Sequence, residues 1–293
     1  MSSYLGPSFG HTGQVRKQRQ QHEETLVKEA LLGGLSNERR EQIRSQAQRE
    51  IPAWYNPWVH LSATTGIGVL ALCLGTWQLA KLGQIEPSDL LIIPITFVLA
   101  NLFEWRVHKH VLHRRRWPME VLYDKHTPMH HMIYVEDDMT LRSQREFRLV
   151  LIPAVGVLGV VLVTTPFALG IAALWSTQAG WLFLVTASLY MVTYELLHLA
   201  YHAPKDSFIG RRRFISAMRR HHARHHNPRL MQRYNFNVII PLSVAAVPLV
   251  LIPAARKPAW LFWLCIGVAV GVLFAMAVNR LVLPAITGWR VGR

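Results

Sequence analysis

Long apolar runs set the pattern of the chain after its first fifty or so residues. A membrane-spanning helix needs about 20 mostly apolar residues. Six stretches come close to this, at roughly 58–80, 88–107, 147–175, 181–202, 236–255 and 259–283. Prolines interrupt the fifth stretch, which could therefore be re-entrant rather than spanning. The pattern predicts an all-α integral membrane bundle of four to six spans.

The N-terminal part of the chain has a different pattern. Residues 1–51 are polar and mixed in charge, with helical periodicity at about 22–32 and again at 37–50. The Arg- and Gln-rich face of the second helix could lie on anionic lipid or simply face water. Aromatic residues beginning at Trp54 then mark the entry to the membrane. We therefore expect a partly helical polar region, followed by a membrane domain over 52–293.

Composition and charge support this division. Hydrophobic residues make up 51% of the chain, and the mean hydropathy is +0.18. The net charge of +15 is uneven, because Lys and Arg gather in 1–57, 104–148 and 203–234. By the positive-inside rule, the N-terminus and both of the later basic segments are cytoplasmic. Nucleic acid is not expected as a partner, since the charge follows the membrane topology and no recognition motif accompanies it.

Histidine forms the second pattern. Twelve of the 15 histidines fall in two clusters, at 104–131 and 194–226. Both clusters lie at predicted span ends on the same side, so we expect a His-rich cap that binds metal. Neutral imidazole binds iron, zinc, copper and nickel well. The clustered residues are His108, His110, His113, His126, His130, His131, His198, His202, His221, His222, His225 and His226.

The spacing within these clusters predicts how ligands pair. Residues four apart share one face of an α-helix, so His198 with His202, and His126 with His130, can each share one metal. His108 lies five residues before the next histidine of its motif, which on an α-helix separates the two by about 140°. That pair would serve two metals or straddle a helix end. Eight to ten imidazoles exceed what one ion accepts, so we expect two ions, about 3.5–4 Å apart.

Two carboxylates lie one helical turn from candidate ligands. Glu104 precedes His108 by four residues, and Glu195 precedes His198 by three. Either could accept the outer N–H of a metal-bound imidazole and fix its tautomer. The alternative for each is a polar contact between spans. His110 and His221 are further possible ligands, although a histidine beside a basic run is more often solvated.

The order of these motifs resembles the fatty acid hydroxylase (sterol desaturase) superfamily of membrane oxygenases. The resemblance covers 104–241, and it departs from the family pattern in the three residues that separate His126 from His130. It implies a dinuclear iron centre, O2 as co-substrate, and an external electron donor of cytochrome or ferredoxin type. The ligands that it implies are His108, His113, His126, His130, His131, His198, His202, His222, His225 and His226.

The sequence therefore predicts an O2-dependent lipid hydroxylase or desaturase. Its substrate would be a fatty acyl, sphingolipid or sterol-type chain, because only a metal–oxygen species can attack an unactivated C–H bond. Imidazole suits zinc as well as iron, so the residues alone leave the metal open. The alternative function is a divalent-metal transporter with cytoplasmic His-rich loops. Transporters usually place their ligands near the bilayer midplane, whereas these histidines are expected at span ends.

Overall fold

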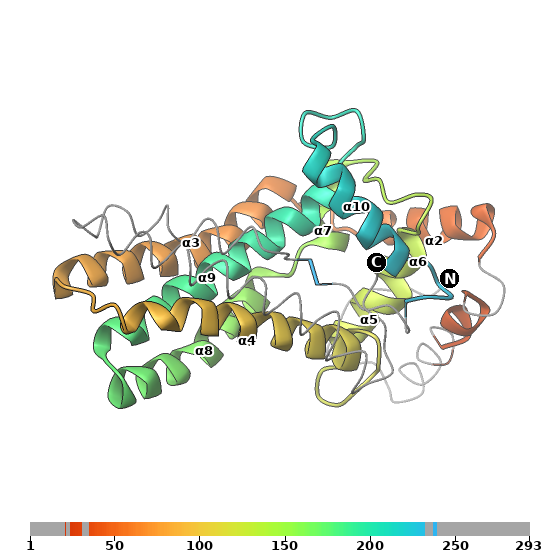
Figure 1. Ribbon diagram of the computed structural model, residues 1–293. Coiled ribbons are helices and arrows are strands. Elements are labelled where there is room, and N and C mark those ends of the chain that lie inside the picture. Colours follow the sequence, from red (N-terminus) through yellow and green to blue (C-terminus); the bar gives the residue numbers. More distant parts are fainter. Residues whose placement is uncertain (1–20, 22–23, 31–34, 232–236, 239–293) are drawn as a thin grey trace.

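Four long helices lie side by side in the computed structural model, and shorter helices form a cap at one end of them (Figure 1). The structure describes residues 21, 24–30, 35–231, 237 and 238. The spans expected at 236–255 and 259–283 fall almost wholly outside this part of the chain. Within it the fold is helical, and the only strand-like pairing is an isolated bridge between Val135 and Asp138.

The long helices match the first four apolar runs. Together with the short turns next to the second and third helices, they form four stretches that are long and apolar enough to cross a membrane, which confirms the expected membrane bundle. These stretches are Pro57–Leu82, Asp89–Leu112, Gln144–Leu174 and Thr177–Tyr201. A short helical segment precedes the second one, and a break at 151–153 separates the third from the turns before it. The four helices are α3 (Pro57–Leu82), α4 (Ile92–Val107), α8 (Ala154–Leu174) and α9 (Thr177–Tyr201).

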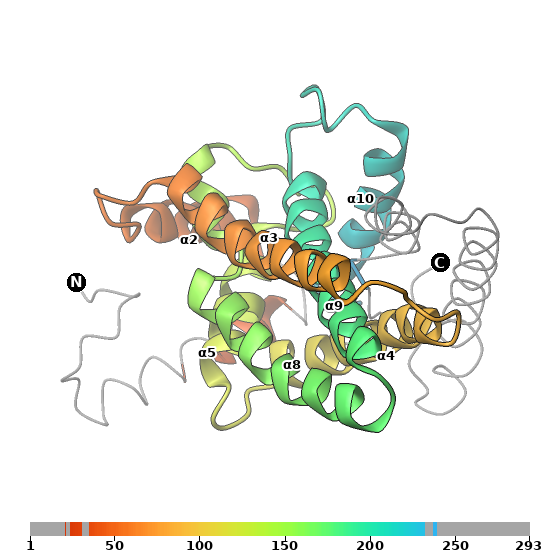
Figure 2. The ribbon, with the colours of Figure 1, turned by 90° about the vertical axis from the view of Figure 1, so that its left-hand side faces the viewer.

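Helix α9 is the centre of this bundle, since α3, α4 and α8 all pack against it (Figure 2). Small residues permit the close approach of α3. A Cβ atom on Gly68 or Gly75 would lie 2.5 or 2.6 Å from a methyl group of Val192 or Val185, respectively. Small residues at helix contacts are the usual means of tight packing in membranes, where burial of apolar surface gives no drive for association.

The outward faces of the bundle are apolar. On α4 the exposed side chains Ile95, Leu99 and Phe103 follow one another at four-residue intervals, and α8 exposes a similar surface that includes Leu162 and Phe167. Proteins in water rarely expose large contiguous apolar patches. The faces are those that a lipid environment requires.

The cap covers the end at which α4 and α9 finish and α3 and α8 begin. The Thr64 hydroxyl, near the start of α3, donates to Ile152 O just before α8, at 2.9 Å. Both histidine clusters therefore meet at one end of the bundle, as the sequence predicts. The cap contains α2 (Asn37–Arg49), α5 (Glu120–Lys125), α6 (His131–Ile133), α7 (Phe147–Val150) and α10 (Arg213–His225).

Helix α2 confirms the polar helix expected at 37–50. It begins after Ser36, whose side chain accepts a hydrogen bond from Arg39 N at 3.2 Å, as N-cap residues commonly do. The expectation that the basic face of this helix lies on lipid or faces water is wrong for Arg44. This side chain is only 2% exposed, and it packs against Ile133 and Thr140 within the cap. The earlier polar helix spans 24–30 in the described residues.

We predict that Gly180→Ala destabilises the bundle. A Cβ atom there would lie 2.7 Å from Ala168 O and 2.8 Å from Ala172 Cβ, so α8 would have to move away from α9. Such overpacking costs about 1–3 kcal/mol, seen as a lower melting temperature in detergent. Gly170→Ala in α8 is the matched control, since a Cβ there meets no described atom within 4 Å. Equal melting temperatures for the two variants would contradict the prediction.

Candidate metal centre

Two π-helical turns bring histidines five residues apart onto one face. The first, η2 (His108–Leu112), continues α4, and the second, η3 (His126–His130), continues α5. A π-turn closes i→i+5 hydrogen bonds, so residues five apart stack as residues four apart do on an α-helix. His108 then aligns with His113, and His126 with His131. The divergence of about 140° expected on an α-helix does not arise.

Two ordinary helix ends supply the remaining candidate ligands. His202 follows directly after α9, one turn beyond His198. At the end of α10, His222 and His226 are likewise four residues apart. The two histidine clusters thus approach each other from the ends of α4, α5, α9 and α10.

The side chains converge in two groups, within each of which the candidate ligand atoms lie within 4.8 Å of one another. Nearly all members are buried, and each group could hold a metal ion. The first histidine group is His108, His113, His126, His131 and His225. The second histidine group is His130, His202, His222 and His226.

The nitrogen separations fit coordination of a shared ion. In the first group, His126 Nε2 lies 3.1 Å from both His108 Nε2 and His131 Nε2. In the second, His222 Nε2 lies 3.2 Å from His202 Nε2 and 3.1 Å from His226 Nε2. Imidazoles bound to one ion at about 2.0–2.1 Å place their nitrogens about 2.9–3.4 Å apart.

Hydrogen bonds on the far side of four of the rings set their tautomers. Main-chain carbonyls accept from Nδ1 of His130, His202 and His226, through Leu149 O at 3.0 Å, Met139 O at 2.8 Å and Tyr134 O at 2.6 Å. In the first group, His113 Nδ1 lies 3.2 Å from the Thr127 hydroxyl, which itself donates to Leu112 O. Each of these rings therefore turns a proton-free Nε2 toward its group, as metal-binding histidines do.

This arrangement fits a cation in the second group. His202 Nε2 and His226 Nε2 are both acceptors, and both approach His222 Nε2, which carries at most one proton. At least one contact therefore brings two lone pairs together. In addition, His130 Nε2 is buried and has no hydrogen-bond partner among the described residues. Unpaired buried nitrogens are costly unless an ion binds them.

Burial keeps these imidazoles neutral. Burial lowers the pKa of His130 to about 3. In rings such as His131 and His222, burial and the neighbouring imidazoles both lower the pKa. Neutral rings have the free lone pairs that a metal requires. The pKa falls well below its usual value for the same main cause, burial, at His113, His126, His131, His202, His222 and His226.

Residues adjacent in the sequence divide between the groups. His130 and His131 point to different groups, as do His225 and His226. The two groups are therefore in contact. The ring of His131 in the first group stacks on that of His226 in the second, with 4.2 Å between the ring centroids. His126 and His130, which α-helical spacing would place on one metal, lie in different groups, because the π-turn aligns His126 with His131 instead.

The other predicted ligands lie around the groups. The ring of His198 is 5.0–5.2 Å from those of His130, His202 and His222, beside the second group but not within it. Its Nε2 is buried and has no hydrogen-bond partner in the described part of the chain, so its role as a ligand stays a prediction. His110, whose ring packs edge-on against Trp105, and His221 belong to neither group.

The predicted carboxylates make other contacts. Glu104 accepts hydrogen bonds from the Tyr190 hydroxyl and from Val238 N. Glu195 accepts from Ile152 N at 3.0 Å. Their contact with metal-bound imidazoles stays a prediction. The sequence did not predict the groups that accept hydrogen bonds from the histidine rings. Of these, only the Thr127 hydroxyl could have been suspected, because Thr127 is a polar side chain next to His126.

Comparison of the chain with protein-family models, with curated proteins and with solved structures gave no match.

We predict that the purified protein binds two metal ions and that each group holds one of them. His225→Ala should remove the ion of the first group, and His202→Ala that of the second, each leaving about one equivalent of metal. Elemental analysis of the detergent-purified chain measures this. His221→Ala is the control, because His221 lies on α10 next to the candidate ligands but belongs to neither group. A metal content that is unchanged in both ligand variants would refute the assignment.

Proposed function

We propose that this chain is an O2-dependent membrane oxidoreductase that hydroxylates an aliphatic C–H bond of a lipid. Desaturation is the alternative outcome at the same site. The observation that carries the proposal is the pair of touching, buried, all-imidazole groups at the end of a bundle of membrane-spanning helices. The two groups would hold two iron ions.

The choice of iron rests on the reaction proposed. An unactivated C–H bond has no acidic proton, so the side chains here cannot break it by acid–base chemistry. Two bound irons would supply the O2 chemistry that this bond requires, whereas zinc has no redox chemistry. Hydroxylation places one oxygen atom of O2 in the C–H bond and reduces the other to water. Two electrons and two protons are consumed, and an external donor of cytochrome or ferredoxin type would supply the electrons.

The protein's own residues prepare the site. Burial excludes water from the imidazoles and keeps them neutral, and the carbonyls of Tyr134, Met139 and Leu149 hold three rings in place. Water exclusion protects a reactive site from side reactions. This rigidity would fix the ligand geometry before any substrate arrives.

The position of the site supports an apolar substrate. His108 directly follows α4, and His202 directly follows α9, so the ligands adjoin the apolar part of two spans. A fatty acyl, sphingolipid or sterol-type chain could therefore reach the site from the bilayer. The basic segments near the cap could hold a polar head at the interface.

Lipid mass spectrometry of cells with and without the protein tests the proposal. Wild-type protein should produce a lipid that has gained one oxygen atom or lost two hydrogen atoms. His202→Ala should abolish this product and lower bound iron, whereas His221→Ala should keep both. The proposal fails if His202→Ala remains active at wild-type iron content.

Metal flux in proteoliposomes separates this function from transport. The two histidine groups lie at span ends and in the cap, whereas transporters bind ions near the midplane. We expect no flux of iron or zinc above that of empty liposomes. Flux that depends on His202 would favour the transporter instead.

A further inference from the structure

A tight hairpin between the spans α4 and α8 contacts the second histidine group. Val135 N donates to Asp138 O at 3.2 Å, and Asp138 N donates to Val135 O at 2.9 Å. These two bonds join the arms of the hairpin at its tip. Beyond the tip, the carbonyls of Tyr134 and Met139 form one wall of the hairpin, and those of Ile133 and Thr140 form the opposite wall.

One wall of the hairpin holds two ligands. Tyr134 O accepts from His226 Nδ1 at 2.6 Å, and Met139 O accepts from His202 Nδ1 at 2.8 Å. Leu141 N also donates to His202 O at 2.9 Å. Half of the second group is therefore oriented by main-chain atoms of this one hairpin.

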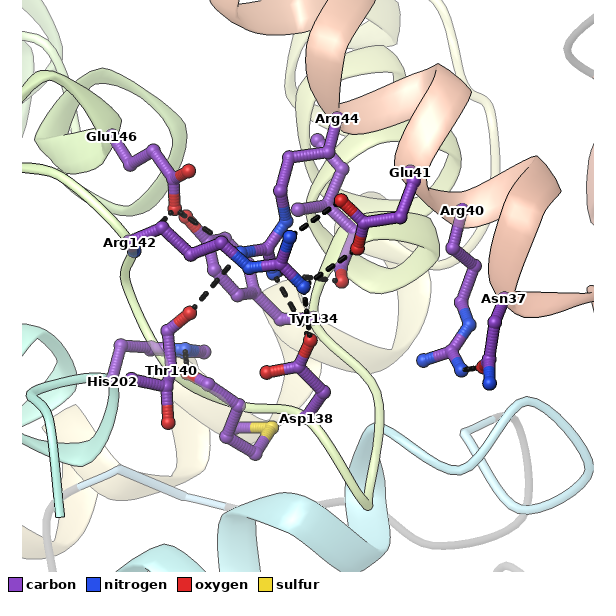
Figure 3. A network of polar contacts seen from close by, with 12 residues as sticks. Asn37, Arg40, Glu41, Arg44, Tyr134, Asp138, Thr140, Arg142, Glu146 and His202 are labelled. Carbon is purple, nitrogen blue, oxygen red and sulfur yellow. Dashed lines mark hydrogen bonds and ion pairs between the residues drawn. The ribbon is translucent and has the colours of Figure 1, made fainter.

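Arg44 of α2 holds the opposite wall (Figure 3). One terminal nitrogen of its guanidinium donates to Thr140 O and the other to Ile133 O, each at 3.3 Å. These carbonyls directly neighbour the two that hold the ligands. A planar guanidinium can bridge two acceptors in this way, whereas the ammonium of a lysine is a single point charge.

Two carboxylates, one of them fully buried, fix the guanidinium in this place. It lies 3.8 Å from a carboxylate oxygen of the fully buried Glu146 and 3.7 Å from one of Asp138. Glu146 also accepts from the Tyr134 hydroxyl at 2.8 Å. Burial and the charge of Glu146 raise the pKa of Tyr134, so the phenol stays a donor. Burying charges is costly, and this network offsets the cost while it ties α2 to the ligand-bearing hairpin.

The geometry points to Arg44 as a positioning residue for the second metal ion, acting through the two arms of the hairpin on His202 and His226. Helix α2 then belongs to the metal centre, although it supplies no ligand. This inference rests on the proposal that the second histidine group binds an ion. It predicts that loss of Arg44 weakens one ion and spares the other.

Cobalt(II) titration of apo-protein tests this, with visible absorption as the signal. His225→Ala leaves the second group to be titrated alone, and His222→Ala leaves the first. Adding Arg44→Met should weaken Co²⁺ binding about 10–100-fold in the His225→Ala protein, as loss of outer-shell support typically does. In the His222→Ala protein the affinity should change less than about twofold.

Arg142→Met is the matched control. Arg142 also pairs with Asp138 and with Glu41 of α2, but it is about half exposed and its side chain contacts neither wall of the hairpin. Its loss should leave both affinities unchanged. If Arg44→Met weakens both groups equally, Arg44 acts only on general stability, and if it weakens neither, the hairpin needs no support. Either result overturns the inference.

Arg44→Lys separates charge from bridging, and it also serves if Arg44→Met does not fold. Lysine keeps a positive charge beside Glu146, so the melting temperature should stay near that of the wild type. It cannot bridge both carbonyls, so Co²⁺ binding at the second group should remain weaker than in the parent. Full affinity with lysine would overturn the bridging role. If the wild-type protein binds no Co²⁺ at all, the metal centre itself is wrong, which is a distinct outcome.

Discussion

The structure depends on placing nine imidazoles in contact inside the protein. Buried nitrogens normally need hydrogen-bond partners, and here several ring nitrogens at 3.1–3.2 Å face one another instead. Carbonyls take the outer N–H groups of His130, His202 and His226, so these rings cannot satisfy each other as donors. Such a core is costly for the protein alone and favourable once cations lie among the lone pairs. If the two groups bind metal ions as proposed, folding and metal binding would be coupled in this cap.

Much of the architecture could be predicted from the sequence, because it follows from periodicity and length. The first four apolar runs became spans, and the polar stretch at 37–50 became α2. Nine of the ten histidines expected as ligands lie in the two groups, and His198 lies beside them. Composition and spacing are sufficient for such features, since each depends on the character of many residues or on a repeated residue type.

The sequence could not predict which histidines pair with one another. Spacing arguments assumed α-helical geometry, which places His126 with His130. The π-turn at His126–His130 changes the register by one residue and sends these two rings to different groups. The burial of Arg44 could not be predicted either, because an arginine on a polar helix fits the same sequence pattern whether it faces water or a buried carboxylate. The carbonyl acceptors carry no sequence signal.

The two histidine groups share the segments that carry them, but they differ in the contacts behind their rings. The 126–131 segment and α10 contribute to both groups, so any shift of α10 would disturb both groups together. The outer contacts are not shared, because the hairpin carbonyls hold only the second group, whereas the Thr127 hydroxyl meets His113 of the first. Residues behind the imidazoles can therefore affect one group without the other. An arginine on a helix that carries no ligand is well placed to do so, because its charge stays outside both groups while its hydrogen bonds fix the backbone that orients one of them.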